Sequence, residues 1–357
     1  MRYVLPVALA ALAFGSAQAQ DAEPASPFFE HPTELRHAYA LDLLSLQLDI
    51  LELSGGEEES EEAVTTDAAE GEDAAATEEA AAGAEEGEEE EEGLVDTAMP
   101  LLSGSLGAAN AALLTELQEA FEATETGDEA TVAPAREVLS KAESALVPKE
   151  LASDLTFRAN RLALLSTLEP GVGEGYEEAA GGETEAYIIG YAGLKHIEAE
   201  YGDFKGELQG DTTDIDRAFG VLDGLMAGPE LPERFSDPED AELAVTDIVV
   251  GLESITQATL LPRDFLTLLG VIETHVEEGC AAAEAGDTEL ALEWGTAADF
   301  FYSAYLADTV GVLAAEPAEV ITSGLGEFLE DPGSAQTPAT CESVQQGLTD
   351  ASALFGG

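Results

Sequence analysis

The sequence predicts an all-α fold of antiparallel helical hairpins, and three observations carry that prediction. Apolar residues recur at helical spacing along much of the chain. A helix–turn–helix unit occurs twice, at an offset of 104 residues. A sheet would require runs of alternating β-branched residues between turn signals, and the sequence contains no such run. We therefore expect helical hairpins packed along their apolar stripes.

The repeated unit comprises Val172–Tyr201 and Val276–Tyr305. Aligned without a gap, seven of the first fourteen positions are identical, including Gly182 and Gly286. A weaker third copy is LQEAFEATETGDE, at 117–129. Glycine just past a helix end adopts the left-handed conformation of a C-cap, and the acidic residue, Thr and Glu that follow open the next helix. Each copy is therefore predicted to be a helix, a Gly-acid turn and a second helix.

The N-terminus has the pattern of a secretory signal peptide. An apolar run follows Arg2 and gives way to small residues ending in Ala17-Gln18-Ala19, which predicts a signal peptide over 1–19. This run is too short to span a bilayer. Residues 20–32 are rich in Pro, Ala and Ser and are expected to form a flexible leader. The mature chain is thus expected to be periplasmic or secreted, with no transmembrane segment.

Two helical domains are predicted after the leader. The first covers 33–205 and is interrupted by an acidic loop at 56–93; the second covers 206–357 and holds the second repeat copy. Within the loop, Glu57–Glu92 contains 18 acidic residues and no base. Such a composition buries too little apolar surface to offset the entropy of ordering. The loop is therefore predicted to be disordered, with low-affinity cation binding as the alternative.

Start and stop signals place the individual helices. Ala38, Leu41, Leu44, Leu48 and Leu51 form a clear apolar stripe on the first of them. Outside the repeat copies, the helices expected are 33–53, 94–123 with a bend near Gly104 and Gly107, 131–146, 150–168, 212–226, 238–260, 315–329 and 340–355. The helix that carries the second copy is expected to begin at Pro262.

The charge is extreme, with 75 acidic residues against 12 Lys and Arg and a formal net charge of −63. From Asp264 to Gly357 there are 17 acidic residues and no Lys or Arg. This argues against nucleic acid as a partner, because its binding needs basic residues, and against anionic membranes. It fits cationic ligands, metal ions or a salty medium. Two interpretations stay open: a solvated surface adapted to salt, and specific cation binding.

Two cysteines, Cys280 and Cys341, occur in the expected exported chain. An even number of cysteines in an oxidising compartment favours a disulfide. Two free, buried thiols are the alternative.

Histidines and neighbouring glutamates supply the candidate metal ligands. His196 and Glu200 lie four residues apart, opposite an aromatic stripe, whereas Glu198 falls inside that stripe. His275 and Glu278 lie one helical turn apart. Imidazole and carboxylate suit Fe, Mn or Zn, and the sequence does not choose among them. The alternative is an exposed His196–Glu200 pair, with Glu198 reaching water at the edge of the stripe.

Other patterns point to structure rather than chemistry. Glu34 and His37 have the Glu-x-x-His spacing of di-iron bundles, but no second such pair exists, so a surface pair is expected. Trp294 and the aromatic residues Phe300–Tyr302 and Tyr305 of the second copy suit core packing. No motif for a nucleophile, a phosphate loop or a zinc protease is found, so we expect no enzymatic activity and no cofactor other than a divalent or iron cation.

Two stretches resemble known families. Tyr176-x-x-Ala179-x-x-Gly182 and the rhythm of Ala281–Ala298 resemble the exported helical domain of bacterial high-affinity iron permeases. The permease's Arg-Glu-Gly-x-Glu motif is absent. Gly193–Glu198 is similar to the Gly-x-His-x-x-Glu motif of imelysin-like iron-regulated periplasmic proteins, although there the histidine stands one place nearer the glycine. The resemblance implies a periplasmic helical module in iron uptake.

Together these features predict an exported acidic helical binding module, for a metal cation and linked to iron uptake. The alternative is a structural or protein-interaction scaffold of the cell envelope with a salt-adapted acidic surface. A binder should have His196 or His275 lining a pocket with two or more carboxylates. A scaffold should have these residues scattered.

Overall fold

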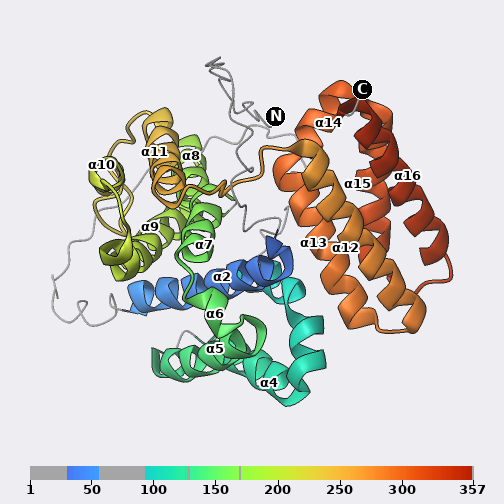
Figure 1. Cartoon of the computed structure of the whole chain (residues 1–357). Coiled ribbons are helices and arrows are strands. Elements are labelled where there is room, and N and C mark those ends of the chain that lie inside the picture. Colours follow the sequence, from blue (N-terminus) through green and yellow to red (C-terminus); the bar gives the residue numbers. More distant parts are fainter. Residues whose placement is uncertain (1–29, 56–92, 125, 127–128, 169, 356–357) are drawn as a thin grey trace, which may run out of the picture.

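The computed structural model describes residues 30–55, 93–124, 126, 129–168 and 170–355 (Figure 1). Within these ranges the chain is all-α and has no strand, as predicted. The expected signal peptide, nearly all of the leader and the acidic loop up to residue 92 lie outside the described residues.

The N-terminal part of the described chain is a long helix followed by a helical hairpin. Its elements are α2 (Pro32–Gly55), α3 (Leu94–Ala98), η2 (Met99–Leu101), α4 (Ser103–Thr124), η3 (Glu129–Thr131) and α5 (Val132–Leu146). In Figure 1, α2 crosses the middle of the molecule and the other groups of helices lie around it.

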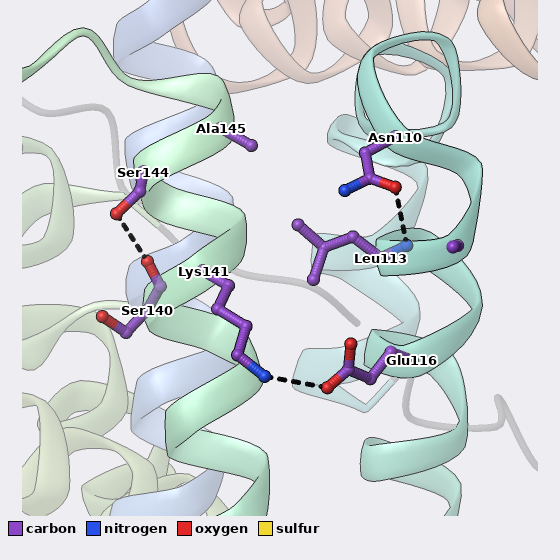
Figure 2. A pocket seen from close by; sticks show the side chains of 8 residues that line it. Asn110, Leu113, Glu116, Ser140, Lys141, Ser144 and Ala145 are labelled. Carbon is purple, nitrogen blue, oxygen red and sulfur yellow. Dashed lines mark hydrogen bonds and ion pairs between the residues drawn. The ribbon is translucent and has the colours of Figure 1, made fainter.

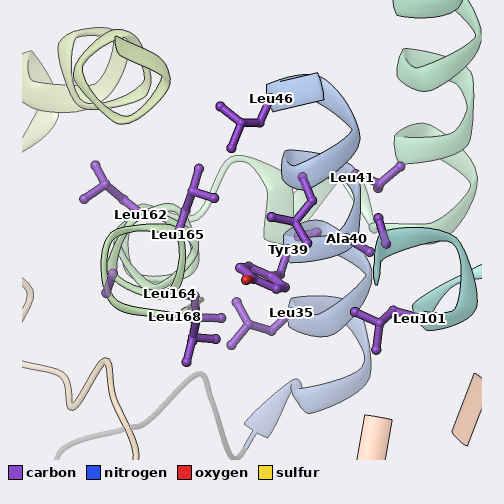
Figure 3. Packing of buried hydrophobic residues seen from close by; sticks show 14 of the residues in the cluster. Leu35, Tyr39, Ala40, Leu41, Leu46, Leu101, Leu162, Leu164, Leu165 and Leu168 are labelled. Atoms are coloured by element: carbon purple, nitrogen blue, oxygen red, sulfur yellow. The ribbon is translucent and has the colours of Figure 1, made fainter. Parts of the chain in front are cut away.

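Helix α2 is the structural centre. Every residue from Leu35 to Leu44 is buried, on all sides of the helix. Figure 3 shows why: Leu162 and Leu165 of a later helix flank α2 on one side, and Leu101 of η2 lies on the other. A helical segment that is buried around its whole circumference belongs in a core, and here three of its buried residues, Arg36, His37 and Asp42, are polar. The predicted single apolar stripe therefore covers only part of the buried surface of α2.

The middle of the chain forms a second group of helices. Its elements are α6 (Lys149–Ala152), α7 (Leu155–Thr167), α8 (Val172–Gly181), α9 (Thr184–Phe204), η4 (Lys205–Glu207), α10 (Thr213–Leu225) and α11 (Pro238–Thr256). α10 and α11 pair as a hairpin, and α11 packs on α7 and α8. The boundary expected at residue 205 thus falls inside one packed group, and the next group begins after α11.

The C-terminal bundle is the third group. It contains α12 (Phe265–Ala285), α13 (Thr288–Tyr305), α14 (Ala307–Leu313), α15 (Ala315–Glu330) and α16 (Thr337–Phe355). α12 pairs with α13, α15 pairs with α16, and α16 packs on α12. A disulfide between Cys280 and Cys341 joins α12 to α16 across a Cα–Cα distance of 6.1 Å. The predicted pairing is confirmed, and the alternative of free thiols is wrong.

The internal repeat is confirmed at the level of hydrogen bonds. Gly182 ends α8 with φ of 118°, and Gly286 ends α12 with φ of 78°, both in the left-handed region. The Gly182 N–H donates to the Ala179 carbonyl at 3.1 Å, and the Gly286 N–H donates to the Ala283 carbonyl at 3.0 Å. In each copy the next N–H donates to the carbonyl five residues earlier, as in a Schellman cap. Both hairpins therefore turn through the same glycine cap.

Two of the expected helices are interrupted. Leu94–Leu101 and Ser103–Thr124 meet at an 89° bend, which lies just before the bend predicted near Gly104 and Gly107. Asn110 then leaves helical geometry, and its side-chain oxygen accepts the Leu113 N–H at 3.2 Å, which replaces a backbone partner. The helix expected over 150–168 is divided because Asp154 caps α7. Polar side chains that bond the nearby backbone thus set these breaks.

Within the described ranges, no single helix has both the length and the apolar character to cross a membrane. Only the bent pair of Leu94–Leu101 and Ser103–Thr124 meets those criteria when both parts are counted together.

The α8–α9 hairpin depends on a close helix crossing at Gly175. A Cβ atom at this position would lie 2.7 Å from the Ala186 carbonyl oxygen and 2.9 Å from the Gly190 Cα. The equivalent glycine of the second copy, Gly279, has more room, since its Cβ would lie 3.3 Å from the Trp294 Cβ. The first hairpin is therefore the tighter of the two.

We predict that Gly175→Ala destabilises the protein by about 1–3 kcal/mol, because backbone rather than a flexible side chain must move. Gly181→Ala in the same helix is the matched control, since a Cβ there meets nothing within 4 Å. Urea unfolding of both variants measures the difference. Equal stability of the two would contradict the close crossing.

Candidate functional site

Polar side chains of α2 enter two clusters of charged groups, one buried and the other with partly exposed members. The junction cluster consists of Arg36, His37, Ser105 and Glu293. The histidine cluster consists of Asp42, Asp49, Arg136, Arg161 and His196. These two clusters bring together most of the buried charge of the described chain.

The junction cluster joins α2 to α13 of the C-terminal bundle. Arg36 is 1% exposed and Glu293 is 0% exposed, and the Arg36 Nη2 donates to the Glu293 Oε1. The His37 Nε2 lies 3.1 Å from the same oxygen. The Ser105 N–H donates to the Glu293 Oε2 at 2.6 Å, and its hydroxyl donates to Oε1 at 2.6 Å. The buried carboxylate is therefore paired and fully hydrogen-bonded, as a buried charge must be.

The protonation states of this cluster follow from its surroundings. Burial alone raises the pKa of Glu293, but the hydrogen bond with His37 and the charge of Arg36 outweigh it and hold the pKa below its ordinary value. Burial lowers the pKa of Arg36 to about 10 despite the nearby carboxylate. Burial also lowers the pKa of His37. At neutral pH the cluster is thus an arginine–glutamate ion pair with a neutral histidine beside it.

His275 lies next to the junction cluster, behind an aromatic side chain. The Arg36 guanidinium stacks 4.6 Å from the centre of the Trp294 ring, and the His275 ring lies 5.2 Å from the same ring. The His275 Nδ1 donates to the Val271 carbonyl at 2.8 Å. Burial and the charge of Arg36 lower the pKa of His275 to about 3. This histidine is a neutral core residue.

Three expectations about these residues are corrected. His275 and Glu278 are not a pair, because His275 faces the core and Glu278 is exposed. His37 is not on the surface, because α2 is covered all round and the ring is only 4% exposed. Its spacing partner Glu34 lies 4.0 Å from His31 instead.

The histidine cluster ties α2 to α5, α7 and α9. The His196 Nδ1 lies 3.1 Å from the Asp49 Oδ2, and its Nε2 lies 3.8 Å from the Asp42 Oδ1. Arg161 donates to Asp42 at 2.5 Å, and Arg136 donates to Asp49 at 2.6 Å. Each carboxylate is thus shared between the histidine and one arginine.

His196 is a buried cation. Burial lowers its pKa, but the neighbouring carboxylates of Asp42 and Asp49 outweigh burial and raise the pKa to about 10. An imidazolium has no free lone pair for a metal. The alternative of an exposed His196–Glu200 pair is wrong for His196: only 13% of its side chain is exposed, because α9 packs against both α2 and α7.

The two glutamates near His196 have partners of their own. Glu198 lies 2.7 Å from the Lys195 Nζ and is 26% exposed. It therefore reaches water at the edge of the aromatic stripe, which was the alternative to a role as a metal ligand. Glu200 lies 3.9 Å from Arg158. Glu200 and His196 both line a small, partly open cavity of about 10 Å³ with Asp42, Arg158, Arg161, Leu162, Leu165 and Ile197. This cavity has room for about one water molecule.

The five candidate ligands therefore fall in separate places. His196 and Glu200 share one small cavity, Glu198 lies at the surface beside them, and His275 and Glu278 belong to the C-terminal bundle. In the described ranges, no group of three or more His, Cys, Asp or Glu side chains could hold a metal ion.

An open groove of about 520 Å³ lies between α4 and α5 (Figure 2). It opens where Asn110 interrupts α4. Lys141 and Glu116 bridge it with a 2.9 Å ion pair. None of the candidate ligands lines this groove.

Sequence reasoning missed the acidic and basic members of both clusters. One signal was present for Glu293. It has helical spacing with Ala297 and Phe301, which are both buried, and in the first repeat copy its position is taken by Ile189. A glutamate that replaces an isoleucine on a core face must find a cation, and the nearest stretch of sequence supplies none.

We predict that His196 makes stability depend on pH in the alkaline range. Its folded pKa of about 10 lies above its ordinary value of 6.5. The stabilisation is therefore complete below pH about 6.5 and declines as pH rises toward about 10, by up to about 1.4 kcal/mol per pH unit. Urea unfolding from pH 6 to 10 should show this slope in the wild type and lose it in His196→Gln. Identical slopes would contradict the buried imidazolium.

No protein-family model, curated protein or solved structure significantly matches the chain.

Proposed function

We propose that this protein is an exported, acidic, non-enzymatic interaction scaffold that binds basic segments of protein partners. One observation carries the proposal: most of the basic residues in the described ranges are bound within internal or local ion pairs, while the acidic residues remain in excess on the surface. Arg36, Arg136 and Arg161 belong to the junction and histidine clusters. Most other bases pair with carboxylates on the same or a neighbouring helix.

The C-terminal bundle shows the imbalance most strongly. Of its 17 acidic residues, every one except Glu293 and Asp299 is exposed, and the same stretch has no Lys or Arg. Such a surface attracts cationic groups and speeds their association at low salt. It favours a basic partner over nucleic acid or an anionic membrane.

His196 lines its cavity with the carboxylates of Asp42 and Glu200, as expected of a binder, but the pairing of these groups favours a scaffold over a binder of iron or another metal. His196 does contact two carboxylates, but Arg136 and Arg161 occupy the same carboxylates and the imidazole is protonated. A metal would have to displace a proton and break two arginine pairs. His275 lies behind Trp294, away from exposed carboxylates. The predicted iron-linked role therefore gains no support from these residues.

Salt and metal titrations distinguish the two functions. We predict that NaCl raises the melting temperature gradually, because it screens repulsion among the surface carboxylates. Micromolar Fe, Mn or Zn should give no additional saturable rise, and His196→Ala should have the same salt slope as the wild type. A saturable rise at micromolar metal that is lost in His196→Ala would favour the metal-binding module instead.

A further inference from the structure

One end of the C-terminal bundle exposes a group of large apolar side chains, here called the apical patch. It consists of Leu266, Val312, Leu313 and Leu354, whose exposed fractions are 42%, 86%, 58% and 44%. The start of α12, the whole of α14 and the end of α16 lie at this end of the bundle (Figure 1).

Two local features bring these residues to one end. The rings of Phe265 and Phe355 lie 5.4 Å apart, so the start of α12 touches the end of α16. Leu266 and Leu354 are the sequence neighbours of these rings. Val312 and Leu313 end α14, where the extended backbone of Ala314 turns the chain into α15. Apolar residues gathered on an exposed surface mark sites of interaction.

Exposed carboxylates lie close in sequence to the residues of the apical patch. Asp264, Asp308, Glu316 and Asp350 are all exposed, and each lies within about one helical turn of a patch residue or of Ala314. No Lys or Arg occurs from Asp264 onward. The nearest base in sequence, Arg263, is engaged with Glu253 at 2.5 Å. Apart from the paired Arg263, the exposed charges nearest to the patch residues in sequence are therefore negative.

We propose that the apical patch docks an amphipathic helix of a protein partner whose apolar face is flanked by Lys and Arg. The partner's apolar side chains would cover Val312 and Leu313, and its cations would face the four carboxylates. This inference rests on the proposed function and adds the surface and the class of segment. A second copy of the chain does not fit, because both surfaces would be strongly negative. An anionic membrane is disfavoured for the same reason.

Two synthetic helical peptides of equal charge test this surface. One carries Leu and Lys on opposite faces, and the other has Ser in place of Leu. Fluorescence anisotropy with the mature full chain at physiological salt should show both peptides binding, with the Leu/Lys peptide at least about tenfold tighter. The double variant Val312→Ser with Leu313→Ser should remove this gain in affinity from the Leu side chains. Its affinity for the peptide with Ser in place of Leu should be unchanged. The matched control, Val221→Ser with Leu243→Ser, removes exposed side chains elsewhere and should keep the gain.

The outcomes separate this surface from the proposed function. If both peptides bind but the gain is absent, or survives in the Val312–Leu313 variant, the apical patch is not the docking surface and the acidic scaffold stands. If neither peptide binds, the proposed function fails and this inference fails with it. Dimers in sedimentation velocity that the Val312–Leu313 variant abolishes would assign the patch to a second copy. Vesicle binding that the same variant abolishes would assign it to a membrane.

Discussion

The pair between Arg36 and Glu293 is the interaction on which the arrangement of the helices depends. The C-terminal bundle buries a carboxylate but contains no Lys or Arg of its own. α2 supplies the missing cation, and α4 adds the two hydrogen bonds of Ser105. Neither side can bury its charge alone, since an unpaired buried ion costs several kcal/mol. The first described helix and the last bundle are therefore electrically complementary.

The same shortage of basic residues explains why the surface is so negative. With 12 Lys and Arg against 75 acidic residues, each base placed inside the fold leaves the outside more negative. Arg136 and Arg161 neutralise Asp49 and Asp42 next to His196, so α2 is also held to α5 and α7 through ion pairs. The interior uses its cations to fix the packing, and the surface stays strongly acidic.

The fold could be predicted because its signals are local. Gly182 and Gly286 each predict a turn, because glycine readily adopts the left-handed backbone conformation. In the structure both residues end their helices with the same Schellman hydrogen bonds. The Cys280–Cys341 pairing followed from the count of cysteines. The helix breaks at Asn110 and before Asp154 were missed, because side-chain capping there outweighs an otherwise continuous apolar pattern.

The candidate site was harder to predict because its partners are distant in sequence. Periodicity placed His196 opposite the aromatic stripe of its own helix, but it could not show that α2 covers that side as well. Glu293 and Arg36 are 257 residues apart, and no local pattern links them. The chemistry of a buried charge depends on which helix lies against it, and a single sequence does not contain that information.

A double-mutant cycle on Arg36 and Glu293 tests the central pair most directly. Urea unfolding of Arg36→Met, Glu293→Gln and the double variant gives the coupling free energy between the two side chains. Each single change should cost about 3–5 kcal/mol, because it strands the other charge or its hydrogen-bond partners in the core. The double variant should lose less than the sum, by at least about 2 kcal/mol. Small and additive losses would show that the pair does not hold α2 to the C-terminal bundle.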